Sequence, residues 1–192
     1  MRAVRRPGVL VWERPYASNF VEWCMQRGFA VALWSSGARR NIDPIVTHVL
    51  PKRLRSHLLF VWSQEECTVH EGKDVAVHAG ARNNGARKPL LLKELRHVWR
   101  RWPAWGPQST VLVDDDPLKC ERNPPHTAIH PAKWCALRTP PGAQLELAPG
   151  GALPTYLDGL LAAPDTQAHM AAAPYVAPAA DAADGGAASD ED

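Results

Sequence analysis

The chain has 192 residues, 45% of them hydrophobic and eight of them tryptophan, which is enough apolar material for one compact core and excludes a fully disordered chain. Charge is distributed unevenly, because residues 1–164 hold all 22 Lys and Arg but only 14 of the 20 acidic residues. The four cysteines form no CxxC pair, and the longest charge-free apolar stretch is about half of the ~20 residues that span a bilayer. We therefore expect neither a disulfide framework nor a membrane helix.

In the first part of the chain, short apolar runs alternate with helical patterns, which is typical of βαβ units around a parallel sheet. The expected elements are, in chain order, a strand over 9–12, a helix over 18–28, a strand over 29–34, a helix over 41–50 and a strand over 58–62. Ser18 is expected to cap the first helix, and Gly28 is expected to end it. The fold class that this pattern predicts is α/β.

The second part of the chain continues this alternation and then changes composition. The expected elements are a polar loop over 71–88, a helix over 90–102, a strand over 110–113 and a short strand over 127–129. From residue 138 the chain is rich in Pro, Gly and Ala. We therefore expect four parts: a domain over 1–137, a linker over 138–152, a docking helix over 153–163 and a disordered acidic tail over 164–192.

Polar residues follow two of the predicted strands. Ser35 and Ser36 come after the strand over 29–34, and Asp114, Asp115 and Asp116 come after the strand over 110–113. Ligands of parallel sheets gather at these carboxyl ends, and adjacent carboxylates are oxygen ligands that suit Mg²⁺. Two simpler interpretations stay open, namely that the acids cap the helix opened by the following proline and that the serines form an ordinary turn.

Several further segments stand in an order that is similar to one family. They are Glu13-Arg-Pro-Tyr16, Val31-Ala-Leu-Trp-Ser35, Asn41-Ile-Asp-Pro44, Lys93-Glu-Leu95 and Val111-Leu-Val-Asp-Asp-Asp-Pro117. This order resembles the FCP homology domain, the branch of the haloacid dehalogenase superfamily related to NLI-interacting factor. The resemblance runs from about residue 13 to residue 134.

The resemblance implies a HAD-like parallel sheet flanked by helices and a Mg²⁺-dependent phosphatase that acts on Ser/Thr phosphoproteins or peptides. Carried over by position, Ser35 and Ser36 are expected to bind phosphate, and Lys93 is expected to neutralise its charge. Asp114 and Asp115 resemble the metal-site acids. From its position in the predicted helix, Lys93 has the alternative of being a solvated surface lysine.

One part of the family pattern is missing. The family's nucleophile lies in a D-x-D-x-[TV] motif on a first, central strand, whereas the first aspartate of this chain is Asp43. We therefore expect a domain that is incomplete at its N-terminus and inactive as a phosphatase. The missing strand belongs between the strands over 29–34 and 110–113, so we expect these two to pair directly or the segment 9–12 to fill the gap.

The functional alternative is a non-catalytic binding protein that resembles the presequence receptor of the mitochondrial inner-membrane translocase. The phosphatase interpretation places the protein in the nucleus or cytoplasm, and the alternative places it in the mitochondrion. Two other sites are weaker: a nucleic-acid surface built from the Arg and Trp residues of segment 96–105, and zinc sites formed by Cys67 with His70 or by Cys120, His126, His130 and Cys135. For both we favour ordinary core residues.

Overall fold

The computed structural model describes residues 3–6, 9–76, 87–137, 139 and 145–178. The helices are α1 (Ala17–Gln26), α2 (Arg39–Val49), α3 (Lys52–Arg55), α4 (Arg96–Arg101), α5 (Ala152–Ala162) and α6 (Thr166–Ala172). Short 3₁₀ helices are η1 (Gln64–Glu66), η2 (Pro107–Ser109) and η3 (Pro117–Cys120). The strands are β1 (Ala3–Arg6), β2 (Val9–Trp12), β3 (Leu33–Trp34), β4 (Val61–Trp62), β5 (Thr68–Ala76), β6 (Arg87–Leu92), β7 (Leu112–Val113) and β8 (Ala128–Ile129).

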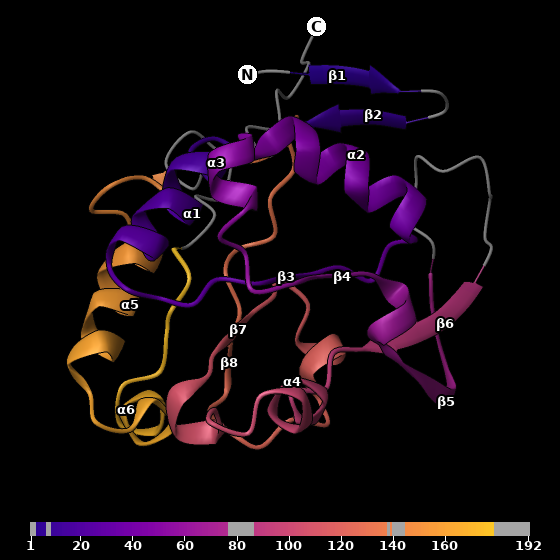
Figure 1. Cartoon of the computed structure of the whole chain (residues 1–192). Coiled ribbons are helices and arrows are strands. Elements are labelled where there is room, and N and C mark those ends of the chain that lie inside the picture. Colours follow the sequence, from indigo (N-terminus) through magenta and orange to yellow (C-terminus); the bar gives the residue numbers. More distant parts are fainter. Residues whose placement is uncertain (1–2, 7–8, 77–86, 138, 140–144, 179–192) are drawn as a thin grey trace, which may run out of the picture.

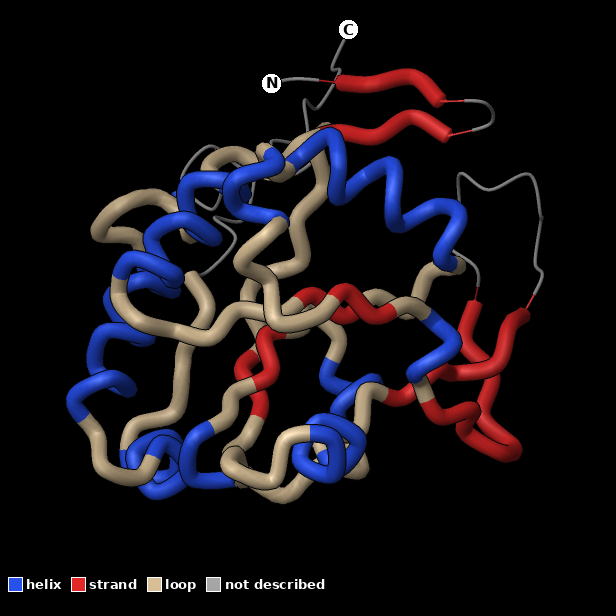
Figure 2. The backbone as a smooth tube through the Cα atoms, in the orientation of Figure 1, coloured by secondary structure: helices blue, strands red, loops and turns tan. Residues whose placement is uncertain are grey.

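The strands within these ranges form four two-stranded sheets (Figures 1 and 2). Two sheets are parallel: β3 pairs with β4, and β7 pairs with β8. The other two are antiparallel hairpins, β1 with β2 and β5 with β6. The expected α/β class is therefore confirmed as a mixture of helices and small sheets, and each predicted parallel strand is shortened to its last two residues or nearly so.

The expected pairing around the gap is wrong for the residues that the structure describes. β3 does not pair with β7, and β2 pairs with β1 instead of filling the space between them. Phe29, Val31 and Val111, which lead into these strands, pack against the same apolar cluster.

One cluster of buried apolar side chains joins α1, α5 and α6 to β8. Its buried members come from α1, β8, the segment before α5, α5 itself and α6, namely Cys24, Ile129, Leu147, Leu153, Leu157, Leu160 and Met170. In α5, three of these leucines recur at helical spacing and bury one face of the helix. The predicted docking helix is thus present with nearly the predicted bounds.

The segments that flank α5 differ from the expectation. Glu146 and Leu147 are buried, although they belong to the expected linker. α6 lies within the expected disordered tail, where the Asp165 carboxylate caps it by accepting a hydrogen bond from the Ala168 amide (2.9 Å). Met170 of this helix packs into the core with only 3% of its surface exposed. Amino-acid composition does not predict that α6 is ordered, because a single side chain, Met170, anchors it to the core. Residues 179–192 of the expected tail lie outside the described residues.

The predicted helix over 90–102 is a strand followed by a shorter helix. Leu90 and Leu92 are buried while Leu91 is half-buried, which is the two-residue period of a strand, and α4 begins only at Arg96. β5 occupies much of the expected polar loop and pairs with β6, while residues 77–86 of that loop lie outside the described residues. A run of three leucines is compatible with both a helix and a strand. Pairing with β5 makes this run a strand.

The first helix also begins earlier than predicted. α1 starts at Ala17, so Ser18 is inside it, and Tyr16 stands at the cap position with a positive φ of 63°. Its end is predicted correctly, because Gly28 follows the last turn with φ 95°, a conformation that glycine adopts without strain. None of the described helices is both long enough and apolar enough to cross a bilayer.

Candidate functional site

A cluster of two lysines and one aspartate lies where three segments meet. Lys93 directly follows β6, Asp114 directly follows β7, and Lys119 belongs to η3. The Asp114 amide donates to the Ile129 carbonyl (3.1 Å), so the β7–β8 ladder continues to this residue and fixes its position. The Lys93 amide donates to the Lys119 carbonyl (2.8 Å), which holds the two lysine backbones together.

Asn123 fixes the segment that carries Lys93. Its side-chain amide donates to the Lys93 carbonyl (2.8 Å), and its side-chain oxygen accepts from the Leu95 amide (2.7 Å). One side chain therefore satisfies a carbonyl and an amide that α4 does not use, and it orients the turn between β6 and α4.

The ammonium of Lys93 forms a buried ion pair with Asp114 Oδ2. Asp114 Oδ1 is 3.3 Å from the Lys119 ammonium and accepts a hydrogen bond from the Asp116 amide (2.9 Å). Lys93 and Asp114 are each only 6% exposed. The interpretation of Lys93 as a solvated surface lysine is therefore wrong.

The charges of this cluster control its protonation. Burial acts to raise the pKa of Asp114, but the neighbouring charges of Lys93 and Lys119, with the Asp116 amide, outweigh it and hold the pKa below the ordinary 3.8. Burial, together with the Asp114 charge, raises the pKa of the nearby Cys120 thiol to about 12. Asp114 is therefore ionised and Cys120 is a neutral thiol at neutral pH.

Ser35 lies at the carboxyl end of β3, and none of its described hydrogen bonds joins it directly to the cluster. The Cys67 thiol contacts the Ser35 carbonyl (3.9 Å). Burial raises the pKa of this thiol, and the charges of Lys93 and Lys119 oppose that shift only in part. The Ser35 hydroxyl accepts a hydrogen bond from the Gly37 amide (3.1 Å) and Ser36 is half-buried beside it. A Cβ on Gly37 would lie 2.8 Å from Cδ1 of Ile42, so a larger residue here would make the end of that side chain shift.

The described residues do not fit a magnesium ion. Asp114 has both oxygens engaged by ammonium groups, and Asp115 is exposed. Asp116 caps η3 by accepting from the Leu118 amide (3.1 Å), as the simpler interpretation predicted. Throughout the described part of the chain, no three His, Cys, Asp or Glu side chains lie together as a metal site.

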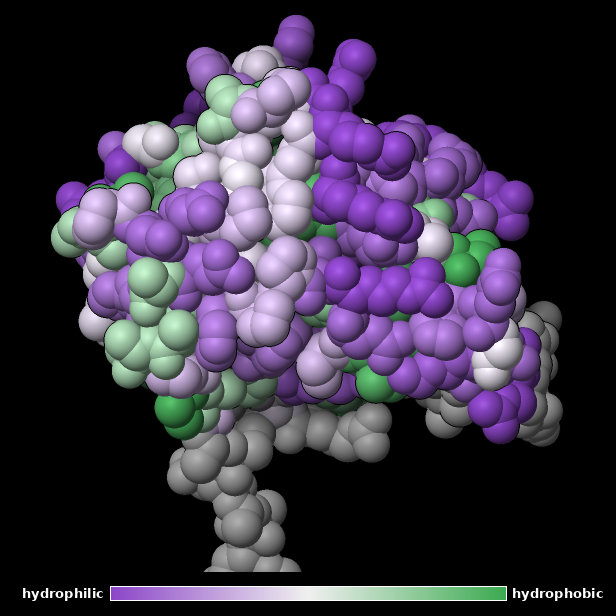
Figure 3. Space-filling view, turned by 90° about the horizontal axis from the view of Figure 1, so that it is seen from below, coloured by the Kyte–Doolittle hydropathy of each residue, from purple (hydrophilic) through white to green (hydrophobic). Residues whose placement is uncertain are grey.

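The tryptophans of segment 96–105 are half-buried. Trp102 stacks on Phe60 with ring centres 5.0 Å apart, and the Trp99 indole donates to the Thr110 hydroxyl (3.2 Å). Arg100 and Arg101 are exposed on the side of the molecule that carries α4, which is largely hydrophilic, while more apolar surface lies toward α5 and α6 (Figure 3). Trp99 and Trp102 therefore pack against neighbouring side chains, whereas Trp105 lines a pocket.

Fold and site together define an α/β domain whose polar cluster lies beyond the carboxyl ends of short parallel strands. The sequence model of the family described as NLI interacting factor-like phosphatase matches residues 2–147. Because this match covers most of the chain, the protein belongs to that family, and the resemblance inferred from its motifs is confirmed. No curated protein matches the chain.

Sequence reasoning located some of these residues and missed others. The strand-end pattern indicated Ser35 and Asp114, and only the family order indicated Lys93. Lys119, Asn123 and Cys67 were not assigned to this site from the sequence. Asn123 and Lys119 reach the site through the fold of the segment that follows the three aspartates.

Proposed function

We propose that this protein is a phosphate-binding domain of the phosphatase family, with a HAD-like arrangement of its parallel strands, and that it recognises phosphorylated Ser or Thr in peptides. The observation that carries this proposal is the buried lysine, Lys93, held beside the carboxyl end of β7 by Asp114. Because little water screens it, the net positive charge that Lys93 and Lys119 keep beyond Asp114 can attract a phosphoryl group.

Each neighbour has a role in binding the anion. Lys93 and Lys119 supply positive charge, of which Asp114 neutralises one unit. The hydroxyls of Ser35 and Ser36 and the amides of their turn supply hydrogen bonds at the end of β3. A phosphoserine carries a charge of about −1.5 to −2 at pH 7, so this cluster complements it.

Hydrolysis needs a group that attacks phosphorus, and the buried carboxylate of the described cluster is not free to do so. Asp114 is the carboxylate buried in the cluster, and its two oxygens are engaged by Lys93, Lys119 and the Asp116 amide. Such a carboxylate is a poor nucleophile, because attack would break its ion pairs. The proposed activity of this chain alone is therefore binding without turnover, and no step through Mg²⁺ is proposed.

The proposal is tested by calorimetric titration of the protein with inorganic phosphate and with a phosphoserine peptide. Ser35→Ala is expected to weaken binding about fivefold, the effect of losing one hydrogen bond of about 1 kcal/mol. Lys93→Met is expected to weaken it at least tenfold. Lys73→Met is the matched control, since Lys73 is a more exposed lysine paired with Glu121.

Two results would contradict the proposal. One is equal phosphate affinity of the wild type and the Ser35→Ala variant, which preserves the ion pair of Lys93. The other is turnover of p-nitrophenyl phosphate by the 192-residue protein that disappears in Asp114→Asn, because this would make Asp114 a catalytic group. Circular dichroism of each variant shows that a loss of binding is not a loss of folding.

A further inference from the structure

We infer that an arginine surface around α4 binds the acidic segment 181–192 of this same chain. The arginine surface consists of Arg96, Arg100 and Arg101 of α4 and of Arg122, which lies just after η3. This contact does not involve Lys93, Lys119 or Asp114, so it is independent of the proposed function. Three features support it: the positive charge of the surface, the way its guanidinium groups are held, and the charge and reach of the segment.

A single buried carboxylate holds two of the arginines. The Glu94 side chain is only 5% exposed, and its oxygens lie 2.7 Å from Arg96 Nε and 3.9 Å from Arg122 Nη1. The two arginine side chains are 61% and 42% exposed, so Glu94 anchors them from below while they reach solvent. Each guanidinium has five N–H donors, and this one carboxylate leaves most of them available to another anion.

Arg100 and Arg101 have neutral partners. The Arg100 guanidinium donates to Nδ1 of His97 (2.6 Å), which accepts only when it carries no proton, and Nε2 of the same ring contacts the Thr68 hydroxyl (3.1 Å). The Arg101 guanidinium lies over the Trp102 ring, 6.0 Å from its centre. Both arginines are therefore oriented by neighbours, and neither has an anionic partner among the described residues.

The positive charges of this surface act on one another. Arg96 and Arg100 are four positions apart on one helix, where like charges repel. The pKa of His97 is lowered by burial and then by the charge of Arg100, with Arg96 adding to the effect and Glu94 opposing it. Four arginines against one carboxylate leave an excess of three positive charges, whereas the carboxyl end of a helix offers only about half a negative charge. The helix dipole therefore does not balance this surface, and a polyanion stabilises it.

The segment 181–192 supplies the opposite charge. After Arg138 the 192-residue sequence contains no Lys or Arg, so the acids of this segment have no basic neighbour along the chain. Three of them are consecutive and repel one another, and this repulsion is relieved when positive charges lie beside them. The acidic residues of the segment are Asp181, Asp184, Asp190, Glu191 and Asp192.

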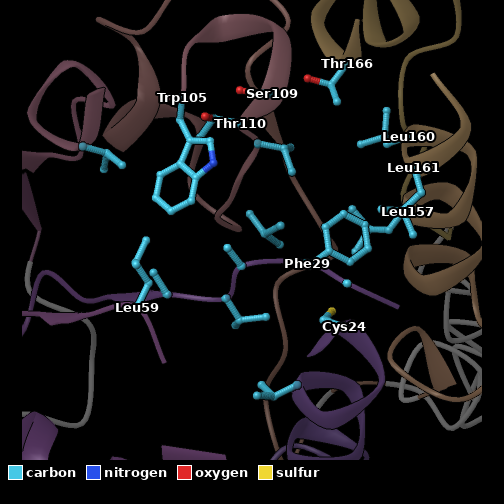
Figure 4. Close-up of a pocket in the computed structure, with 18 of the residues that line it drawn as sticks. Cys24, Phe29, Leu59, Trp105, Ser109, Thr110, Leu157, Leu160, Leu161 and Thr166 are labelled. Atoms are coloured by element: carbon cyan, nitrogen blue, oxygen red, sulfur yellow. The ribbon is translucent and has the colours of Figure 1, made fainter. Parts of the chain in front are cut away.

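The helix that precedes this segment packs close to the arginine surface. In α6, the Thr166 hydroxyl donates to the Pro107 carbonyl of η2 (3.4 Å), and the Gln167 side-chain amide donates to the Pro125 carbonyl (2.7 Å). Figure 4 shows Thr166 near Ser109 of η2 at the edge of a pocket, and Figure 1 shows α4 and α6 on the same side of the molecule. α6 therefore contacts the two stretches of chain that come just after the arginines.

The acidic residues are within reach of the arginine surface. The twelve residues from Pro178 to Asp190 span up to ~40 Å when extended. A domain of this length has a radius of gyration of roughly 16 Å, so the surface is within this span. Single ion pairs at a protein surface are weak, but the covalent link gives the segment an effective concentration in the millimolar range. Several weak ion pairs then suffice to hold it.

The test uses a fluorescein-labelled peptide with the sequence of residues 180–192 and two forms of the 192-residue protein. The second form, the neutral-segment variant, carries Asp181→Asn, Asp184→Asn, Asp190→Asn, Glu191→Gln and Asp192→Asn. In fluorescence anisotropy at low salt, the neutral-segment variant is expected to bind the peptide saturably. The wild type is expected to bind it at least fivefold more weakly, because its own segment competes for the surface.

Matched variants locate the contact on the protein. In the neutral-segment variant, Arg100→Gln with Arg101→Gln is expected to weaken peptide binding at least fivefold. The control is Arg40→Gln with Lys52→Gln, which removes the same charge from two exposed residues of α2 and α3 and is expected to change binding less than twofold. Thermal melting of each variant establishes that it folds, and the neutral-segment variant leaves the described domain unchanged.

The contact within one molecule is measured by NMR. The amide resonances of α4 are expected to differ between the wild type and the neutral-segment variant at low salt. They are expected to coincide at about 1 M NaCl, where the Debye length is about 3 Å. The difference at low salt is expected to be independent of protein concentration, as for a contact within one chain.

Four results would overturn the inference. One is equal peptide affinity of the wild type and the neutral-segment variant, and another is equal weakening by the arginine pair and by its control. A third is a difference in the α4 resonances that grows with protein concentration, which would assign the contact to a second copy. The last is a single-stranded DNA 12-mer that binds both forms alike, which would assign the surface to nucleic acid. None of these measurements uses phosphate, so they leave the proposed function to its own test.

Discussion

The ammonium of Lys93 and the carboxylate of Asp114 form an ion pair across 21 positions of the chain, and both side chains are almost fully buried. The pair connects the end of β6, in an antiparallel hairpin, to the end of β7, in a parallel pair. Two sheets that share no hydrogen bond between their strands are thus held together at the candidate site. Stability and site geometry therefore depend on the same contact.

We predict that Lys93→Met lowers the free energy of unfolding by about 3–5 kcal/mol, because it leaves the carboxylate of Asp114 buried without its main partner. Urea unfolding monitored by tryptophan fluorescence measures this change. The double variant Lys93→Met with Asp114→Leu is expected to recover much of the loss. Lys73→Met, which breaks a partly exposed pair with Glu121, is expected to cost less than about 1 kcal/mol. A double variant as unstable as Lys93→Met would contradict this explanation.

The low pKa of Asp114 predicts that acid lowers the stability of the folded protein. Its pKa in the folded protein is below the ordinary 3.8, since the lysine charges outweigh the effect of burial. The unfolded chain therefore binds a proton at this group more readily than the folded one, and protonation favours unfolding. The contribution of Asp114 is fully present above the ordinary value and is lost as the pH falls from about 4 through the folded pKa.

The measurement is the unfolding free energy between pH 6 and pH 2 for the wild type and for Asp114→Asn. The stability difference between them is expected to be largest near pH 6 and to shrink as the pH falls below about 4. A difference that is constant over this range would show that Asp114 titrates alike in both states.

The sequence predicted the places where polar residues end the strands better than it predicted the strands. Ser35 and Asp114 follow short apolar runs that are visible in the sequence, and the structure places both at strand ends. The end of α1 was readable because Gly28 permits a positive φ. These features are local, so neighbouring residues determine them.

The predictions from sequence are wrong or incomplete where contacts between distant segments of the chain determine the structure. Leu90–Leu92 form a strand because β5 lies beside them, and no local pattern distinguishes this from a helix. Lys119 joins the site because η3 turns it back toward Asp114. Met170 anchors α6 through a contact with a core formed by segments far away in the chain.

We predict that the buried carboxylate of Glu146 stabilises the fold through its three hydrogen-bond donors. It is 2% exposed and contacts the Arg14 guanidinium (2.6 Å), the Tyr175 hydroxyl (2.5 Å) and the Ala132 amide (3.2 Å). Glu146→Ala leaves these three donors without their acceptor, so we expect a loss of about 2–4 kcal/mol. Hydrogen exchange is expected to show faster exchange of the amides of α6, because Tyr175 follows that helix.

The control for this prediction is Asp158→Ala. Asp158 pairs with Arg27 in water at the surface, and its loss is expected to cost less than about 1 kcal/mol. Tyr175→Phe is the milder test, since it removes one donor and leaves the pair with Arg14 in place. Unchanged exchange in α6 of both Glu146→Ala and Tyr175→Phe would show that Glu146 does not hold the segment.

The final prediction concerns α5, a helix that we expected from the sequence to dock and that supplies three leucines to the core. Leu153 is 1% exposed, so truncation to alanine removes apolar contacts and leaves a cavity, at a cost of about 2–5 kcal/mol. Leu161 of the same helix is 40% exposed, and Leu161→Ala is expected to change stability by less than about 1 kcal/mol. Urea unfolding of both variants measures the difference. Equal effects would mean that α5 is not packed on the domain, whereas a large effect of Leu153→Ala with one cooperative transition shows that α5 and the strands unfold together.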